Sequence, residues 1–280
     1  MEGVSNRLGG TGRSGSLVAK LLADRGLRAR TASRSGSDVR FDWDDPATHT
    51  IALDGAASVY LVTPTVRVTY AAQVARFLDL AESAGVRHVT YLSTYNADAA
   101  PEEIDIAAVV AHLAGWPGLT HSVLRPAWVM QNFSDDHLPL VDGVLAVPSC
   151  GNTEAFVDAA DIAAVAAETL ARPGAHAGKR YALTGPQALT FQEVAETIAE
   201  VSGRPVAYQD LDSEAWIAGA LSVGLPAPYA VMLRWLTGAV VSGNGSTPTD
   251  DVEKVTGRPA GTFRAFAERN AAVWTATEPT

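Results

Sequence analysis

A glycine-rich turn near the start of the chain constrains its fold most strongly. Residues 9–15 read Gly-Gly-Thr-Gly-Arg-Ser-Gly, and residues 16–23 continue as a helix-like run. Glycine lets the backbone turn and approach a pyrophosphate, and a helix N-terminus favours phosphate through its unpaired amides. The segment predicts a dinucleotide-binding turn, with a solvent-exposed loop as the alternative. The predicted cofactor-binding residues are Gly9, Gly10, Thr11, Gly12, Arg13, Ser14 and Gly15.

The segment before this turn is unusually polar. A strand at the centre of a parallel sheet is normally a nearly continuous apolar run. Residues 1–8 offer only Met1, Val4 and Leu8 as apolar side chains. Either this strand is short and poorly covered, or this end of the chain is atypical. In both cases, the property that depends on this polar strand is the affinity for the cofactor.

Strand-like and helix-like segments alternate through the first half of the chain. Such alternation predicts right-handed βαβ crossovers and an α/β fold, a Rossmann-like doubly wound parallel sheet. Between the strands, the apolar stripe of Val74, Phe77, Leu78 and Ala81 indicates a helix. A second helix is expected near 103–114. The expected strands are 27–33, 39–43, 57–63, 88–93 and 121–125.

Ligands of a doubly wound sheet bind beyond the carboxyl ends of its strands. The residues that follow the expected strands should therefore line one crevice. The glycine-rich turn lines the same crevice, and the other residues are Ser33, Arg34, Asp42, Thr63, Pro64, Ser93 and Thr94.

The second half has a mixed pattern that predicts a smaller α/β lobe for the substrate. We expect residues 1–130 to form the NADP(H)-binding domain, with 154–172 returning to it. Residues 131–153 and 173–280 then form the smaller lobe. Its expected elements are a strand at 181–184, a strand near 205–209, and helices at 191–202, 213–223, 228–237, 249–256 and 261–274.

Composition excludes several classes of protein. The net charge of −10 argues against nucleic acid as a partner, since a surface that follows phosphates is basic. No apolar run approaches the roughly 20 residues that span a bilayer, and residues 1–15 do not resemble a signal peptide. A single cysteine, Cys150, suits a reducing compartment. The histidines show no metal-ligand spacing. We therefore expect a cytoplasmic protein without a metal site.

The end of the second expected strand indicates which nicotinamide cofactor is bound. An acidic residue there would bond the ribose 2′-hydroxyl, whereas an arginine accommodates a 2′-phosphate. The sequence places Arg34 at this point, which favours NADP(H) over NAD(H). A solvated loop arginine is the alternative. Arg13 is a candidate for a second phosphate contact, and Asp42 either meets the adenine or caps the turn that follows it.

The proton-donating pair of typical short-chain dehydrogenases is absent. In that family, which this layout resembles, a Tyr-x-x-x-Lys motif lowers the tyrosine pKa for proton transfer. The lysines here are at positions 20, 179 and 254, and the residues four positions earlier are serine, alanine and aspartate. A pair of that type therefore plays no part in the chemistry of this chain.

Several further segments make the chain resemble the NmrA-like branch of atypical short-chain dehydrogenases, and most closely its ergot alkaloid biosynthesis reductase-like subgroup. Besides the glycine turn, they are residues 41–46, 59–64, 124–133, 156–163 and 249–258. The resemblance implies NADP(H) binding, with Thr63-Pro64 and Ser93-Thr94 flanking the ribose and nicotinamide. It also implies a substrate pocket beside the nicotinamide. Core packing is the alternative for Trp128 and Phe133 among its four predicted residues, which are Trp128, Gln131, Asn132 and Phe133. Trp216 of the second lobe is a further aromatic candidate for a wall of this pocket.

Two functions fit this resemblance. The first is a reductase that delivers hydride from NADPH to an activated electrophile. An iminium carbon is the favoured electrophile, and a quinone or enone comes next. A cationic iminium accepts hydride without a proton donor, although Ser93 and especially Tyr95 are candidates to polarise a carbonyl. The acidic chain and its aromatic residues suggest a small substrate, cationic or flat and polycyclic. The second is a non-catalytic NADP(H) sensor that binds a protein partner.

Overall fold

The computed structural model describes residues 4–8, 12–116, 118–135 and 137–275. By its contacts the chain divides into two compact units. The first unit holds the described residues up to 126, together with 160–182 and 255–257, and the second unit holds the rest. The assignment of cofactor to one unit and substrate to the other remains a prediction.

A seven-stranded sheet forms the centre of the first unit, in the order β3-β2-β1-β4-β5-β6-β9. Neighbouring strands from β3 to β6 pair in parallel. This order reverses direction between β1 and β4, which creates the switch point at which doubly wound sheets bind ligands. The bounds are β1 Val4–Leu8, β2 Ala29–Ser33, β3 Val39–Arg40, β4 Ala56–Val62, β5 His88–Leu92, β6 Thr120–Pro126 and β9 Lys179–Leu183.

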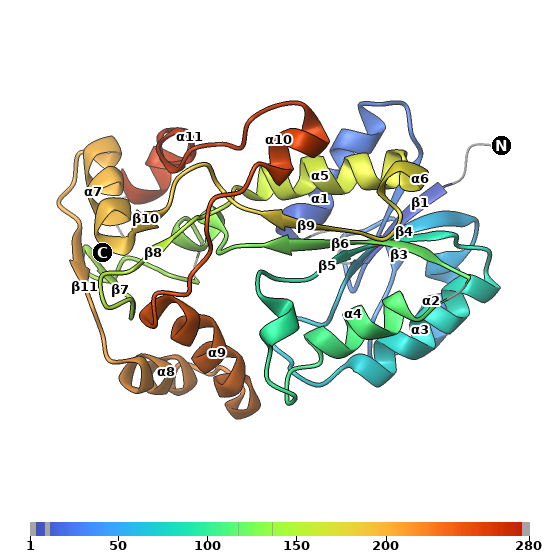
Figure 1. Ribbon diagram of the computed structural model, residues 1–280, viewed down its shortest axis with the longest axis horizontal. Coiled ribbons are helices and arrows are strands. Elements are labelled where there is room, and N and C mark those ends of the chain that lie inside the picture. The colour runs from blue at the N-terminus through green and yellow to red at the C-terminus, as the bar shows by residue number, and fades with distance from the viewer. Residues whose placement is uncertain (1–3, 9–11, 117, 136, 276–280) are drawn as a thin grey trace. The chain divides into compact units, whose positions relative to one another are not determined.

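Helices cover both faces of this sheet. Figure 1 shows α1 and α5 on one face and α2, α3 and α4 on the other. The stripe expected on α3 is confirmed, because Val74, Phe77, Leu78 and Ala81 are its buried residues. The helices are α1 Arg13–Ala23, α2 Ala47–Leu53, α3 Ala71–Ser83, α4 Ile106–Ala114, α5 Ala159–Ala171 and α6 Pro173–His176, with a 3₁₀ turn η1 at Ala97–Ala99.

The sequence-based prediction missed α2 and made the third strand too long. The strand stops at Arg40, and a turn at Asp42–Asp45 leads into the short helix. Pro46 stands at the start of α2, where its missing amide costs nothing. This helix has seven residues, two of them threonine, and gives little helical signal. Burial of Thr48, His49, Ala52 and Leu53 stabilises it.

The second unit is built around an aromatic core. Phe133, Phe156, Phe191 and Phe263 pack there in largely edge-to-face pairs. The expected helix 191–202 is confirmed to the residue. The elements are η2 Met130–Phe133, β7 Val144–Ala146, β8 Thr153–Glu154, β10 Leu189–Thr190, α7 Phe191–Ser202, β11 Ala207–Gln209, α8 Ser213–Ser222, η3 Ala227–Tyr229, α9 Ala230–Val241, α10 Asp251–Thr256 and α11 Phe263–Thr275.

Candidate functional site

The helix α1 follows β1 along the chain, and β1 lies between β2 and β4 in the sheet. Gly12 is the N-cap residue in extended backbone geometry, and it supplies no side chain to cap the helix. No acidic residue occupies the first turn. A helix N-terminus without an acidic first turn suits an anion, so this end of α1 stays the candidate phosphate site. The predicted ligands Gly9, Gly10 and Thr11 lie outside the described residues.

A buried tyrosine positions the predicted ligand Ser14. Tyr60 is in the middle of β4 and has no exposed surface. Its hydroxyl donates a hydrogen bond to the Ser14 hydroxyl over 3.0 Å. This contact joins the neighbouring strand to the first turn of α1. Sequence reasoning missed Tyr60 because its place in an apolar strand indicates only a core residue.

At the end of β2, serines close the turn that presents Arg34. The Ser33 amide donates to the Ser37 hydroxyl over 2.9 Å, and the Ser33 hydroxyl donates to the Ser35 carbonyl over 2.6 Å. Arg34 itself is exposed. Within the part of the chain that the structure describes, its guanidinium forms no hydrogen bond or ion pair. It therefore remains a candidate for the 2′-phosphate.

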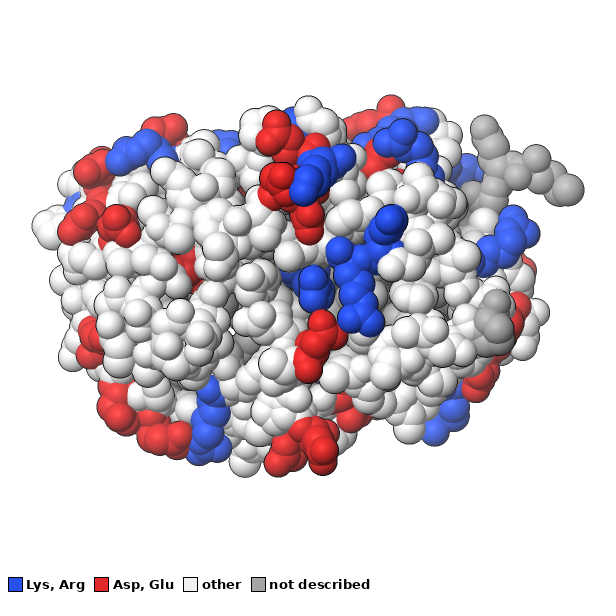
Figure 2. Space-filling view, in the orientation of Figure 1, with Lys and Arg blue, Asp and Glu red and all other residues white. Residues whose placement is uncertain are grey.

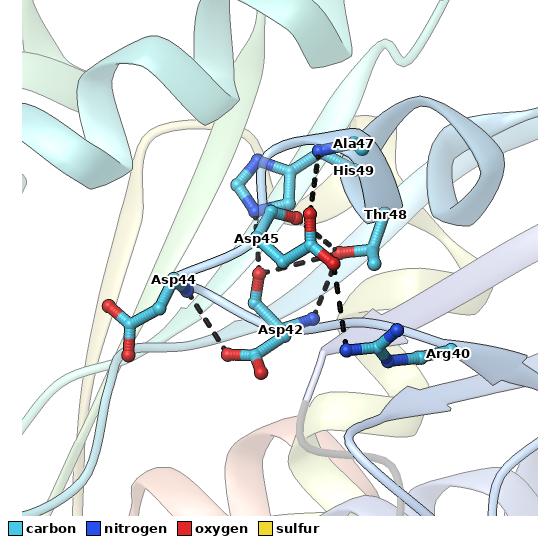
Figure 3. Close-up of polar contacts among 7 residues, drawn as sticks. All are labelled: Arg40, Asp42, Asp44, Asp45, Ala47, Thr48 and His49. Carbon is cyan, nitrogen blue, oxygen red and sulfur yellow. Dashed lines mark hydrogen bonds and ion pairs between the residues drawn. The ribbon is translucent and has the colours of Figure 1, made fainter.

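Asp42 caps the turn after β3, one of the two roles that the sequence left open. Its carboxylate accepts the Asp44 amide over 3.1 Å, as Figure 3 shows. Its own amide donates to the Thr48 hydroxyl over 3.0 Å, and its carbonyl lies 2.9 Å from Nε2 of His49. These contacts fix the turn against α2. A contact between Asp42 and adenine stays a prediction.

The side chain of Asp44 forms a two-armed ion pair with Arg67, from the loop after β4. The two guanidinium nitrogens lie 2.8 and 2.5 Å from its two carboxylate oxygens. Gln73 of α3 adds a hydrogen bond of 3.2 Å. The hydrogen bonds from Arg67 and then from Gln73 lower the pKa of Asp44 to about 2. Asp44 is therefore ionised at any physiological pH.

Ser93 follows β5 and carries a buried hydroxyl that has no hydrogen-bond partner among the described residues. Buried polar groups are normally hydrogen-bonded, so an unpaired one at a strand's carboxyl end fits a polar ligand group. The backbone there is fixed, because the amides of Ser93 and Tyr95 donate to the carbonyls of Leu124 and Pro126 over 2.8 Å each. This arrangement fits the ribose or nicotinamide of a dinucleotide.

The other residues predicted around this edge are half-buried. They are Thr63 and Pro64 after β4, and Thr94 and Tyr95 after β5. Burial is the main reason that the pKa of the neighbouring Tyr91 is raised well above its usual value. Tyr91 therefore stays protonated and is no proton acceptor. The catalytic roles of Ser93 and Tyr95 stay predictions.

In the second unit, two of the predicted pocket residues serve the structure itself. Phe133 is only 3% exposed and belongs to the aromatic core, the alternative that the sequence left open. The side-chain amide of Gln131 donates to Asp158 over 2.8 Å and accepts the Ala159 amide over 2.9 Å. Gln131 thereby holds the start of α5. Phe133 therefore serves the core, whereas Gln131 is half-buried and stays a predicted substrate contact.

The remaining pocket candidates are half-buried. Trp128 packs edge-to-face on Phe191, with ring centroids 5.8 Å apart. Trp216 of α8 lies against the aromatic core, and Asn132 lies in η2. Like Gln131, these three residues stay predicted substrate contacts. Two surface hollows of this unit, of about 410 and 270 Å³, contain none of them; Pro248 and Asp250 line the larger one, and Glu193 and Glu200 line the smaller one.

Charged side chains of both signs are interspersed on the face of the molecule seen in Figure 2. Several form ion pairs, such as Arg125 and Arg180 with Asp98 in the first unit. No helix in the described part of the chain is long and apolar enough to cross a membrane.

Comparison with known proteins identifies similar chains along nearly the full length. Residues 7–237 match the pattern of the NmrA-like family. The chain is 31% identical to agroclavine dehydrogenase of Claviceps fusiformis, aligning 95% of this chain with 96% of that protein. It is 30% identical to an NAD(P)H azoreductase of Xenophilus azovorans over 95% and 98% of the two chains. An NADPH-dependent quinone oxidoreductase of Escherichia coli, solved with NADPH, matches with a TM-score of 0.74 and 26% identity over 95% and 99%.

Proposed function

This chain belongs to the NmrA-like family, and we propose that it transfers hydride from NADPH to an activated small-molecule electrophile. An iminium carbon is the favoured electrophile, and a quinone or enone is the next candidate. The observation that carries the proposal is the full-length similarity to dehydrogenases and reductases. At the level of class, the chain is an NAD(P)H-dependent oxidoreductase, and NADP(H) is its favoured cofactor.

The cofactor-binding edge supports this proposal. The uncapped first turn of α1, Ser14 held by Tyr60, and exposed Arg34 offer groups for the pyrophosphate and the 2′-phosphate. The unpaired Ser93 hydroxyl offers one for the ribose or nicotinamide. When bound, NADPH supplies the hydride; the residues of the chain bind and orient it.

The missing Tyr-x-x-x-Lys pair favours an electrophile that is already polarised. A cationic iminium accepts hydride without a proton, so positioning supplies most of the rate. Reduction of a quinone or enone also needs a proton at oxygen, for which Tyr95 and Ser93 are the candidate donors. The candidates for substrate contact are Trp128, Gln131, Asn132 and Trp216. A flat polycyclic or cationic substrate fits such aromatic side chains.

Calorimetric titration with NADPH and NADH tests the cofactor site. We expect NADPH to bind more tightly, and Arg34→Ala to weaken NADPH by about tenfold or more while changing NADH little, because only NADPH carries the 2′-phosphate. Equal weakening of both nucleotides would assign Arg34 a structural role. Absence of binding by the unchanged protein would contradict the proposed function.

Turnover of an iminium and of a quinone then separates the chemistries. We expect Tyr95→Phe to oxidise NADPH with an iminium at a rate within about twofold of the unchanged protein. With a quinone, the same variant should be slower by roughly 10²-fold, because Tyr95 is the proposed proton donor. Equal loss with both substrates would contradict a proton-donor role. Tight NADPH binding without oxidation by either substrate would instead indicate a sensor.

A further inference from the structure

We propose that Arg67 sets the preference for NADP(H) over NAD(H), by holding the Asp44 carboxylate so that the charge of Arg34 stays available for the 2′-phosphate. Arg67 would thus be a specificity-determining residue that acts through another side chain. This inference rests on the proposed function, since it assumes that the nucleotide binds at the carboxyl end of the sheet.

The ion pair spans the edge at which the adenosine end is expected. Asp44 follows β3 and Arg67 follows β4, and the sheet order places β2 and β1 between these strands. The pair joins the loop after β3 to the loop after β4, and Gln73 of α3 supports it by donating to the Trp43 carbonyl over 2.8 Å and to Asp44 over 3.2 Å. Both contacts of the ion pair are short, 2.8 and 2.5 Å, and the fork of the guanidinium matches the carboxylate.

Arg34 lies beside this acidic turn. Ser33 is in register with Arg40 across β2 and β3, and the Phe41 amide donates to the Ser33 carbonyl over 2.8 Å. Arg34 is the next residue after Ser33. The acidic turn, residues 42–45, begins directly after Phe41. The positive charge of Arg34 also helps to lower the pKa of Asp44, after the larger effects of the hydrogen bonds from Arg67 and Gln73. The two charges are therefore close enough to interact.

Each acidic side chain of the turn already has a partner other than Arg34. The Asp42 carboxylate accepts the Asp44 amide, and Asp45 lies 3.5 Å from Arg40 and accepts the Ala47 amide over 3.3 Å. Figure 3 shows the Asp44 carboxylate turned away from these contacts. Arg67 is the cation that occupies it. Removal of Arg67 would leave one unpaired negative charge next to Arg34.

That charge would act selectively on NADP(H). It would compete for Arg34, and it would repel a phosphate carrying about −1.5 to −2 charges, as phosphate monoesters do at pH 7. NAD(H) lacks this phosphate and would be affected little. Arg67 therefore discriminates between the two cofactors, and a merely structural contact between the loops would affect both alike.

The test measures NADPH and NADH binding to the full-length protein by calorimetry. We expect Arg67→Ala to weaken NADPH by about tenfold and NADH by less than about twofold. Replacing the acid as well, in the double variant Arg67→Ala/Asp44→Asn, should restore most of the NADPH affinity. Without that restoration, Arg67 would contact the phosphate itself and the inference would be wrong.

Arg264→Ala is the matched control. It removes one positive charge and one exposed ion pair, with Glu200 at 2.5 Å, in the second unit. It should leave both affinities unchanged. An NADPH to NADH ratio that Arg67→Ala does not alter, with the effect of Arg34→Ala intact, would overturn this inference alone. Failure of the unchanged protein to bind NADPH would overturn the proposed function and this inference with it.

Discussion

Single residues of similar chemistry have different roles here, and burial separates them. Phe133 and Trp128 come from one segment that suggested a pocket. Phe133 is enclosed by Phe156, Phe191 and Phe263, whereas Trp128 is only half-buried. A large side chain with 3% exposure stabilises the core and has no face left for a ligand.

Truncation of Phe133 tests its role in the core. We expect Phe133→Ala to lower the free energy of unfolding by about 3–5 kcal/mol, the usual cost of a cavity of this size. Phe133→Leu should cost less, because it keeps more of the volume. Urea denaturation measures both. A loss below about 1 kcal/mol for Phe133→Ala would place the ring outside the core.

Tyr60 connects the core of the first unit to its candidate phosphate site. We expect Tyr60→Phe to weaken NADPH by about fivefold, since it removes one neutral hydrogen bond worth about 1 kcal/mol. Calorimetry measures this loss. Tyr181→Phe is the control, because it removes a hydrogen bond to His176 of 2.7 Å and should leave NADPH affinity unchanged. Equal NADPH affinities of the unchanged protein and the two variants would mean that Tyr60 does not contribute to the phosphate site.

At the scale of secondary-structure elements, the first turns of two helices show opposite designs. Thr190 caps α7, where its hydroxyl accepts the Glu193 amide over 3.1 Å while the Glu193 carboxylate accepts the Thr190 amide over 2.7 Å. Gly12 gives α1 no such cap. A reciprocal capping box stabilises its own helix, whereas a helix start without a side-chain cap suits an outside anion.

The cap of α7 can be tested by itself. We expect Thr190→Ala to lower the free energy of unfolding by about 1 kcal/mol, because it leaves the Glu193 amide unpaired. Thr190→Ser keeps the hydroxyl and should retain most of the stability. Thermal or urea unfolding compares the two variants. Equal losses in both would mean that the methyl group of Thr190, and not the cap, stabilises this end.

For the whole molecule, buried histidines make stability depend on pH. His88 is 1% exposed at the start of β5, and its Nδ1 lies 2.9 Å from the Thr120 hydroxyl. Burial, with added effects of His121 and His176, lowers the pKa of His88 to about 4. An unperturbed histidine, as in an unfolded chain, has a pKa of about 6.5. Below pH 6.5 the unfolded chain therefore takes up a proton that the folded protein excludes.

We expect stability to fall progressively as the pH drops from 6.5 to 4. The loss from His88 should be about 2.5 kcal/mol at pH 4.5. Urea denaturation at pH 7 and pH 4.5 measures it, and His88→Gln should show a smaller difference between the two pH values. A pH dependence that His88→Gln leaves unaltered would assign the effect to other groups.

Local pattern alone determined much of this fold. The stripe of α3, the bounds of α7 and the alternation that builds the parallel sheet were all predicted, because periodicity and turn residues act within a few neighbours along the chain. The same local signal predicted the helix that follows the glycine residues and the strand ends that carry Arg34 and Ser93. It could not reveal α2, whose seven residues depend on burial more than on their own propensity.

Only the tertiary structure decided which of these side chains meet. The strand order brings Arg67 to Asp44 and Tyr60 to Ser14, although 23 and 46 positions separate them along the chain. It also showed that Asp42 caps a turn and that Phe133 lies in a core. A sequence specifies the ends of strands through local chemistry. The contacts across those ends depend on which strands become neighbours, and that is a property of the packed sheet as a whole.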